Sequence, residues 1–304
     1  MKFFFKILVF IVIFTSVGHF CRKQTKGFSL HKITSKTLSL SQEKTPLDQQ
    51  LQNQLETILE QPFYFFSRGG QCYVFLSGDG KTVLKFFKQH HIRFWHWFKR
   101  ISLPTFFDPF REKLLKKHEH QSSPYLFQSC KIAYEELKEH TGLIYLHLNT
   151  TEIFKKKLTI YDNLKIAHQI DLDQTEFVLQ KKAEPLRTRF KSLIKTDQIE
   201  EAKNCIDSIL DLMNERYEKG VYDRDPNMHT NYGFIEGRAI EIDIGSYVKD
   251  LSLQEANAFQ DKLVKRIGQL NRWLKKHSPE LSLYLTEKMS GDKNRKNHGK
   301  INHD

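Results

Sequence analysis

The sequence predicts an α+β fold in which a small antiparallel sheet is followed by a mainly helical region. Short alternating segments between residues 63 and 87 are separated by glycine-containing turns, as in a run of neighbouring strands. From residue 197 onward, apolar residues recur every three or four positions, as in amphipathic helices. A polar segment with two further strand patterns, residues 220–245, interrupts the helical region.

The composition is that of a folded protein with a basic surface. The chain of 304 residues is 39% hydrophobic and 28% charged, enough for one large domain or two closely packed lobes. A formal net charge of +12 favours an anionic partner such as a phosphorylated ligand or an acidic lipid surface. Nucleic acid is a disfavoured partner, because the sequence has no recognised nucleic-acid-binding motif and much of the excess charge lies in short runs.

The first 21 residues predict a signal peptide or a membrane anchor. Residues 3–20 are largely apolar and approach the roughly 20 residues needed to cross a bilayer, which would give membrane association. The small residues Ser16 and Gly18 suit cleavage, whereas basic residues from Arg22 onward favour a cytoplasmic main domain if the segment is retained. We therefore expect a membrane-anchored or exported protein, with the side of the membrane left open.

Polar segments separate this region from the folded domain and close the chain. Residues 22–44 are rich in Ser, Thr, Lys and Gln and predict a linker, while residues 290–304 predict a disordered tail. The folded domain is expected at residues 45–289, and it opens with an amphipathic helix that Pro62 ends.

Three short strands between residues 63 and 87 are expected to form an antiparallel meander. Gly69 and Gly70 lie in the turn between the first two strands. In the third strand, Lys85 shares a face with apolar residues, so burial of its ammonium group would require an anionic partner. The alternative is an edge lysine that reaches solvent.

Residues 89–120 form an insertion in which aromatic side chains are interleaved with lysine and arginine. The insertion fits either a cover packed over the small sheet or a surface that docks on a membrane or a partner. A helix follows at residues 124–140, and its rotation of about 100° per residue places Glu136 at the border of the buried stripe and Glu135 on the far side. Glu136 is therefore the better candidate for an inward carboxylate.

The pattern becomes helical again after residue 185. Asp197 and Glu200 have the spacing of a capping box, and they open a helix whose apolar stripe ends at Gly220. Another amphipathic helix is expected to open at Ser252. These helices predict a second, helical part of the domain.

The segment 220–245 carries the side chains best suited to chemistry. Two strands are expected to turn at Glu236–Gly237, with Asn231 just before the first strand and Asp243 just after the second. Hard cations take oxygen ligands, and Mg²⁺ commonly binds one or two carboxylates together with substrate phosphates. Asn231 and Asp243 could supply such ligands, and Asp225 could then accept a proton.

In the order of its motifs the chain resembles the protein-kinase-like superfamily, whose catalytic loop is H-R-D-x-x-x-x-N and whose metal motif is D-F-G. Asp223-Arg224-Asp225 stands where H-R-D would, and Asp243-Ile244-Gly245 stands where D-F-G would. The resemblance covers about residues 63–247. It implies a two-lobed fold, with an N-lobe of sheet and helix at about 63–182 and a small, mainly helical C-lobe at about 186–289.

The resemblance also implies roles for single residues. It implies a nucleotide site formed by Lys85, Glu136, Gly69, Gly70, Gln180 and Lys182. It further implies that Lys85 pairs the phosphates, that Asn231 and Asp243 hold Mg²⁺, and that Asp225 orients or deprotonates the acceptor. The implied function is transfer of the γ-phosphoryl group of ATP to an unknown protein or small-molecule acceptor.

Departures from the family pattern, together with possible export away from ATP, favour an alternative, a catalytically inactive pseudokinase module, at a membrane or exported, that binds partners. Asn231 lies six residues after Asp225, one more than in the family motif. The Gly69-Gly70 turn lacks G-x-G-x-x-G, and few residues separate Gly245 from the next helix, so no long activation segment is present. This shortness also favours a compact atypical or small-molecule kinase over a regulated protein kinase.

Two simpler interpretations of the acidic loop are weaker. Asp223, Asp225 and Asn227 have the alternating spacing of a calcium loop, but Met228 and Phe234 stand where such a loop requires Gly and Glu. A polar turn capped by Asp and Asn is the other interpretation, because these residues favour turns in every kind of protein.

Overall fold

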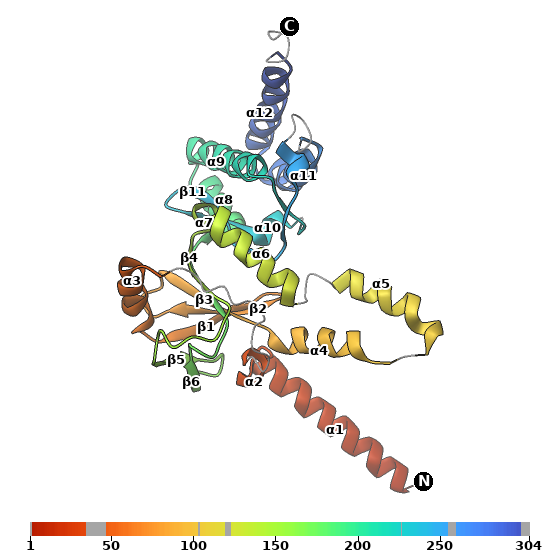
Figure 1. Cartoon of the computed structure of the whole chain (residues 1–304). Coiled ribbons are helices and arrows are strands. Elements are labelled where there is room, and N and C mark those ends of the chain that lie inside the picture. The colour runs from red at the N-terminus through yellow and green to blue at the C-terminus, as the bar shows by residue number, and fades with distance from the viewer. Residues whose placement is uncertain are drawn as a thin grey trace. The chain divides into compact units, whose positions relative to one another are not determined.

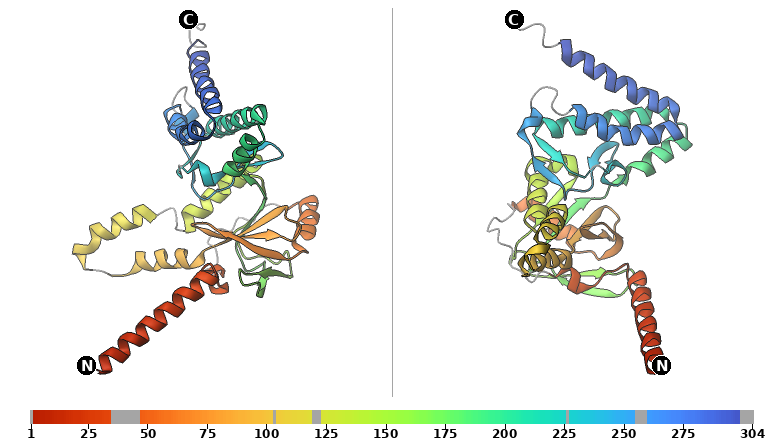
Figure 2. Two further views of the ribbon diagram at one scale, coloured as in Figure 1. Left: turned by 180° about the vertical axis from the view of Figure 1, so that it is seen from behind. Right: turned by 90° about the vertical axis from the view of Figure 1, so that its right-hand side faces the viewer.

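Two units make up the chain in the computed structural model (Figures 1 and 2). Unit 1 comprises residues 1–125 and 144–182, and unit 2 comprises residues 126–143 and 183–304. The structure describes residues 2–34, 47–102, 104–118, 123–225, 227–254 and 260–298. The fold is α+β, with one large mixed sheet and many helices.

Unit 1 is built on a seven-stranded sheet with the strand order β4-β7-β3-β2-β1-β5-β6. Its strands are β1 (Phe63–Arg68), β2 (Cys72–Ser77), β3 (Thr82–Phe87), β4 (Leu143–His147), β5 (Lys157–Tyr161), β6 (Ala167–Asp171) and β7 (Phe177–Lys181). The predicted antiparallel meander of the first three strands is confirmed. The sheet is mixed because β1 and β5 run parallel.

The helices of unit 1 precede and follow the first three strands. They are α1 (Lys2–Gln24), α2 (Leu30–Ile33), α3 (Gln49–Leu59), α4 (Gln89–Arg100), the 3₁₀ helix η1 (Thr105–Phe107) and α5 (Asp108–His118). At the start of α3, the Asp48 carboxylate accepts a hydrogen bond from the Leu51 amide at 2.7 Å, which satisfies one free N–H of the first turn. Residues 35–46, including the expected helix start at Thr45–Pro46, lie outside the described residues.

Aromatic rings fill the interior of unit 1. Phe63, Phe75, Phe86 and Phe177 are fully buried, and the rings of Phe75 and Phe86 meet edge to face with their centroids 5.7 Å apart. Edge-to-face pairs are favoured because the positive ring edge meets the negative ring face.

Part of the segment expected as a linker belongs to this interior. Phe28 and Ile33 are buried with the sheet residues, and the Tyr73 hydroxyl donates to the Gly27 carbonyl at 2.6 Å. Gly27 has φ +76°, a conformation that favours glycine, so the chain turns sharply from α1 onto the sheet. The composition of residues 22–44 is polar, but two apolar side chains suffice to fix residues 25–34 to the sheet.

Unit 2 contains helices and short strands. Its helices are α6 (Ser123–Glu136), α7 (Lys138–Thr141), α8 (Leu186–Lys195), α9 (Ile199–Glu218), α10 (Met228–Asn231), the 3₁₀ helix η3 (Leu251–Gln254), α11 (Gln260–His277) and α12 (Pro279–His298). Its strands are β8 (Glu184–Pro185), β9 (Val221–Asp223), β10 (Tyr232–Ile235), β11 (Arg238–Glu241) and β12 (Tyr247–Lys249). They pair as β11-β10-β8 and as β12-β9.

The apolar stripe of α9 forms the centre of the unit 2 core, where it meets α11 and α12 (Figure 2). The predicted helix is confirmed, but its predicted capping box is wrong. Gln198 is the N-cap residue, without a side-chain cap bond, and Asp197 instead adopts φ +55° in the turn that follows α8. Asp tolerates this left-handed conformation better than most residues. The spacing of Asp197 and Glu200 alone does not distinguish such a turn residue from an N-cap.

Two further boundaries differ from the sequence expectations. The helix expected at residues 124–140 is interrupted at Leu137, whose backbone leaves the helical region before α7 begins. At the other end of the unit, α12 extends to His298, into the segment expected to be a disordered tail. Lysine and arginine are good helix formers, so a polar tail that follows a packed helix can continue it.

Candidate functional site

The β10–β11 hairpin of unit 2 brings Asn231 and Asp243 to the same end of two paired strands. Tyr232 pairs with Glu241, and the Ile242 amide donates to the Asn231 carbonyl at 2.6 Å, so the pairing continues one residue beyond the strands. The predicted turn at residues 236–237 is confirmed, with both residues at positive φ as a tight hairpin turn requires. The local sequence therefore sets the separation of Asn231 and Asp243.

Asp225 lies in the loop between β9 and α10. The Asp225 amide donates to the Asp223 carboxylate at 2.9 Å, and the Asp225 carboxylate accepts from the Asn227 amide at 3.0 Å. From α11, the Arg266 guanidinium donates to the Asp225 carbonyl at 2.7 Å. Successive side-chain-to-backbone bonds of this kind fix the path of a short polar loop.

A buried ion pair between Asp223 and Arg266 fastens this loop to the helical core. Their side chains are nearly inaccessible, and Arg266 Nη1 lies 2.6 Å from Asp223 Oδ2. Burial raises the pKa of Asp223 to about 6, although the Arg266 guanidinium opposes that rise. Burial alone would lower the pKa of Arg266, but the neighbouring Tyr232 and Asp223 outweigh that effect and raise it, so Arg266 stays charged at neutral pH.

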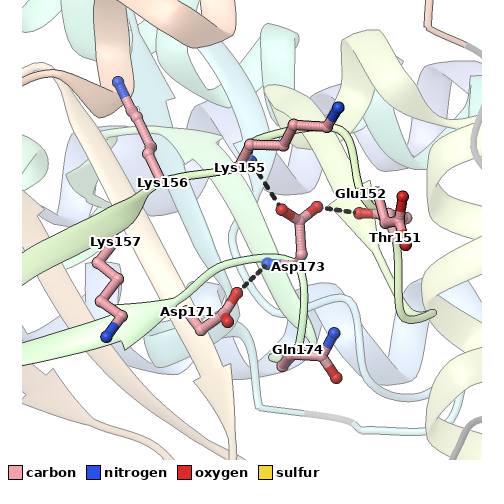
Figure 3. Close-up of a pocket in the computed structure, with 8 residues that line it drawn as sticks. All are labelled: Thr151, Glu152, Lys155, Lys156, Lys157, Asp171, Asp173 and Gln174. Atoms are coloured by element: carbon pink, nitrogen blue, oxygen red, sulfur yellow. Dashed lines mark hydrogen bonds between the residues drawn. The ribbon is translucent and has the colours of Figure 1, made fainter.

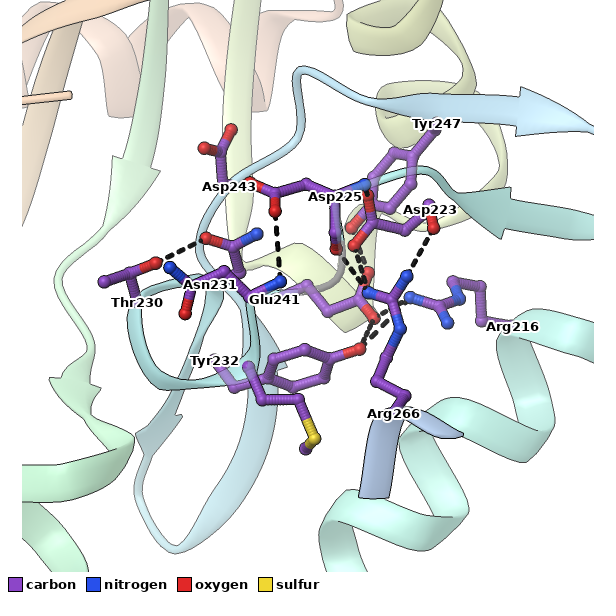
Figure 4. A network of polar contacts seen from close by, with 12 residues as sticks. Arg216, Asp223, Asp225, Thr230, Asn231, Tyr232, Glu241, Asp243, Tyr247 and Arg266 are labelled. Atoms are coloured by element: carbon purple, nitrogen blue, oxygen red, sulfur yellow. Dashed lines mark hydrogen bonds and ion pairs between the residues drawn. The ribbon is translucent and has the colours of Figure 1, made fainter. Parts of the chain in front are cut away.

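A second buried network lies behind the hairpin (Figure 4). The Glu241 carboxylate accepts hydrogen bonds from Arg216 of α9, from the Tyr232 hydroxyl and from the Tyr247 hydroxyl. Burial raises the pKa of Tyr232 and of Tyr247 well above the usual range, so both hydroxyls stay protonated and act as donors. Because Tyr232 follows Asn231 directly, this network holds the start of β10 in place.

The Ser129 hydroxyl connects α6 to the segment that follows Asp243. It donates to the Ile244 carbonyl at 2.6 Å and accepts from the Tyr247 amide at 2.6 Å. The Asp243 carboxylate itself is exposed and accepts from the Gly245 amide at 3.1 Å. The backbone on both sides of Asp243 is thus fixed while its carboxylate faces solvent.

The Asn231 amide has an open hydrogen-bonding position. Its side chain is buried, and Oδ1 accepts from the Thr230 hydroxyl at 2.9 Å. Within the described part of the chain, Nδ2 has no hydrogen-bond partner. A 180° rotation of the amide would let Nδ2 donate to Thr230 and would turn Oδ1 to the open position, and Figure 4 shows this amide between Thr230 and the carboxylates of Asp225 and Asp243.

This arrangement fits a divalent cation only with help from a ligand. Among the described residues, no group of three or more His, Cys, Asp or Glu side chains is placed to hold a metal ion. Asn231 and Asp243 together supply one amide oxygen and one carboxylate. Such a sparse set is the kind that Mg²⁺ uses when substrate phosphates complete its octahedral shell.

Glu136 ends α6, and its carboxylate forms an ion pair with Lys249 of β12 at 2.7 Å. The Glu136 carbonyl also accepts from the Lys219 ammonium at 2.7 Å. Both partners belong to unit 2, so Glu136 helps to join α6 to β12. Its expected role as the partner of Lys85 stays a prediction.

The other expected site residues belong to unit 1. Lys85 lies in the middle of β3, buried, with Val74 and Val178 as its partners in the neighbouring strands. Gln180 is buried in β7 opposite Val83, and Lys182 follows β7 with its side chain exposed. The sequence left burial and an edge position open for Lys85, and the structure shows burial, because β3 is an interior strand.

Gly69 and Gly70 form the turn between β1 and β2. The Gly69 amide donates to the Cys72 carbonyl at 2.9 Å, and the Gly69 carbonyl accepts from the Lys88 ammonium at 2.5 Å. Lys88, which follows β3 as the N-cap residue of α4, also lies over the Tyr73 ring, and burial lowers its pKa. This second lysine beside the glycine turn was not predicted from the sequence, because it lies just beyond the strand that carries Lys85.

The arginines of unit 2 were also missed, although the sequence contains a signal for them. Arg216 follows Met213 by three positions in α9, and Arg266 follows Leu263 by three positions in α11, so both stand on apolar stripes. An arginine on a buried stripe requires a buried acceptor. The two acceptors, Glu241 and Asp223, adjoin the residues expected to act.

An open pocket of about 380 Å³ lies at the loops beside β5 and β6 in unit 1 (Figure 3). The Asp173 carboxylate accepts from the Thr151 hydroxyl and from the amides of residues 153–155. These bonds lower the pKa of Asp173, although burial alone would raise it. The carboxylate is thus occupied by its own loop, which makes it a structural residue.

No protein-family model and no curated protein matches the chain. Among solved structures, it is similar to Rv3197 from Mycobacterium tuberculosis, solved in complex with erythromycin, with a TM-score of 0.33 and 12% sequence identity. The match covers 80% of this chain and 60% of that chain, so this chain spans less than two thirds of that protein's length. The match indicates only a distant structural relationship.

Proposed function

We propose that the two units are the lobes of an atypical protein-kinase-like phosphotransferase that moves the γ-phosphoryl group of ATP to an unknown acceptor with the help of Mg²⁺. The observation that carries the proposal is the hydrogen bond from Ile242 to Asn231, which fixes Asn231 beside the start of the Asp243 segment. Asp225 lies in a loop fastened to the same unit by Arg266. These three residues are the ones that the motif resemblance selects.

In this proposal each residue has one task. Asp243 and the rotated Asn231 amide bind Mg²⁺, which supplies neutralisation of phosphate charge when it is bound. Lys85 binds the nucleotide phosphates, and the amides of Gly69 and Gly70 add hydrogen-bond donors. Asp225 orients the acceptor hydroxyl and takes its proton. Catalysis then consists mainly of positioning and electrostatic stabilisation.

The nucleotide-binding step is tested by thermal unfolding with and without ATP and Mg²⁺. A ligand present at about 100 times its Kd stabilises the folded state by about 2.7 kcal/mol, so the wild-type protein is expected to unfold at a higher temperature. Asp243→Asn is expected to abolish the Mg²⁺-dependent part of this shift. Glu236→Gln, at the exposed turn of the same hairpin, is the matched control and is expected to keep it.

The transfer step is tested with γ-labelled ATP. Asp225→Asn is expected to keep the Mg²⁺-dependent thermal shift but to lose transfer or ATP hydrolysis by about 100-fold or more, since a positioned base contributes about 10² to 10⁴. Absence of any Mg²⁺-dependent thermal shift in the wild-type protein would refute the proposed phosphotransferase activity.

A catalytically inactive binding module is the second candidate. The ion pair of Glu136 with Lys249 favours it, because the carboxylate that the family uses to hold its lysine has another partner here. This candidate predicts that wild type and Asp225→Asn are equally inactive with every acceptor. It also predicts that Glu136→Gln changes stability without changing any nucleotide-dependent signal.

A further inference from the structure

The helices α4 and α5, joined through η1, form a hairpin that stands out from the sheet of unit 1 (Figure 1). Residues 88–118 contain eight Lys or Arg but only two Asp or Glu. The hairpin also exposes large aromatic side chains, among them Trp97 at 56% and Phe106 at 72% exposed. A strongly basic segment with exposed aromatics is uncommon on a surface that meets only water.

The two faces of α4 differ in what they contact. On one face, Phe94 has its ring 5.9 Å from Phe98 and 6.1 Å from Trp97, and Phe94 and Trp97 are exposed. On the other face, the Trp95 ring stacks at 4.5 Å on His118 of α5. The hairpin is thus closed by Trp95, while the Phe94–Trp97 face has no covering element among the described residues.

The tip of the hairpin repeats this pattern. Phe106, Phe107 and Phe110 are exposed, with the first two rings 4.1 Å apart. Arg111 binds the Ile101 carbonyl at 3.1 Å and Asp108 at 2.9 Å, which holds the tip in its folded form. The exposed aromatics are therefore presented by an ordered turn.

The base of the hairpin lies beside the end of the apolar helix α1. Residues 3–24 form a helix long and apolar enough to cross a membrane. The Arg93 guanidinium of α4 donates to the Thr34 and His31 carbonyls, each at 2.8 Å, and so ties α4 to α2. Because α1 joins α2 through the anchored turn at Gly27, an α1 embedded in a bilayer brings α4 to the lipid surface.

We propose that the α4–α5 hairpin docks on an anionic lipid surface, with Phe94, Trp97 and the tip phenylalanines at the level of the headgroups. The tryptophan ring is favoured at that depth, phenylalanine rings add apolar area that enters the lipid boundary, and lysine and arginine gain from the negative surface potential. The link to α1 and the charge excess favour a bilayer over a second protein as the occupant. The proposal needs no nucleotide, so it stands apart from the phosphotransferase activity.

The three tryptophans of the chain make a direct test possible, because Trp95 and Trp97 lie in α4 and Trp273 lies in α11. The full-length protein is reconstituted into vesicles that contain anionic lipid and lipids brominated on their acyl chains. A variant that keeps only Trp97 (W95F/W273F) is expected to show strong quenching by brominated lipid. A variant that keeps only Trp273 (W95F/W97F) is expected to show none.

Charge is tested on the same Trp97-only background. Lys99 and Arg100 are exposed at the end of α4, and K99Q/R100Q is expected to weaken docking by roughly fivefold for each removed cation, seen as less quenching. Vesicles of neutral lipid alone are expected to quench less, and added salt is expected to reduce quenching in anionic vesicles. Equal quenching in neutral and anionic vesicles would overturn the anionic preference.

Two outcomes would overturn docking itself. One is quenching of Trp97 no greater than that of Trp273. The other is protection of Trp97 from a water-soluble quencher in detergent without vesicles, together with a concentration-dependent increase in mass, since this would assign the face to a second copy of the chain. Because W95F replaces the indole that closes the hairpin by a smaller phenyl ring, the single variant W273F, which keeps both α4 tryptophans, serves as the check that the hairpin folds.

Discussion

The two units differ in what fills their interiors. In unit 1, aromatic rings such as Phe75 and Phe86 pack against one another across the sheet. In unit 2, the ion pairs Arg216–Glu241 and Asp223–Arg266 are buried directly behind the residues that the proposed function uses. Apolar swaps that conserve volume usually cost less than about 1.5 kcal/mol in a core, whereas removing one partner of a buried ion pair costs about 3–5 kcal/mol. We infer that unit 2 is less tolerant of substitution than unit 1, because its buried ion pairs fix the position of the β10–β11 hairpin.

The largest expected effect comes from breaking the Arg216–Glu241 pair. Arg216→Met leaves the Glu241 carboxylate buried without its cation, and we expect a loss of about 3–5 kcal/mol in the free energy of unfolding. Urea unfolding followed by far-ultraviolet circular dichroism, which reports on both units, measures this loss. Phe75→Leu in unit 1 is the matched control, with an expected loss of about 1 kcal/mol. Equal losses in the two variants would show that the contrast between the interiors is wrong.

A smaller effect is expected from Gly233→Ala in β10. An added Cβ would lie 2.6 Å from the Glu184 carbonyl oxygen and 2.8 Å from the Ile242 side chain, so the hairpin must shift. Overpacking of this kind costs about 1–3 kcal/mol.

The matched substitution Gly268→Ala in α11 has room, with 3.6 Å to the end of Arg272. We expect it to stabilise the protein by about 0.5–1 kcal/mol, because alanine is the better helix former. Thermal unfolding of both variants checks the two signs, and a harmless Gly233→Ala would mean that the strands beside Asn231 are less tightly packed than described.

The smallest effect is a pH dependence that arises in unit 1. His147 is buried between the Thr175 carbonyl and the Thr151 hydroxyl, and burial lowers its pKa below the ordinary value. Below pH 7 the unfolded chain therefore binds a proton at His147 more readily than the folded chain does. The contribution of neutral, buried His147 to the free energy of unfolding is lost as the pH falls through the unfolded pKa of about 6.5. His147→Gln is expected to flatten the fall in melting temperature between pH 7 and pH 5. An unchanged slope would assign the dependence to other histidines.

Local patterns predicted the parts of the fold that depend on neighbouring residues. The first three strands, the β10–β11 hairpin and the helix α9 were confirmed, because alternation, turn residues and apolar stripes act over a few positions. The hairpin also placed Asn231 and Asp243 at one end of two paired strands, as expected.

Other features depend on contacts between distant parts of the chain. The parallel pairing of β1 with β5 joins Phe63 to Ile160, and nothing in either segment specifies the other as its neighbour. The break at Leu137 has no Gly or Pro to mark it. Arg216 and Arg266 were not predicted to hold the candidate site, because their acceptors Glu241 and Asp223 lie far away in the sequence. Only their positions on buried apolar stripes indicate that they need such acceptors.

The two contacts of Ser129 have a mechanical consequence. One hydroxyl oxygen bridges a carbonyl and an amide on either side of Gly245, so a shift of α6 pulls on the strand that leads away from Asp243. A ligand or protein that binds α6 and shifts it would therefore change the orientation of the Asp243 carboxylate. Ser129→Ala removes this one oxygen atom and with it both contacts, while the apolar stripe of α6 stays intact.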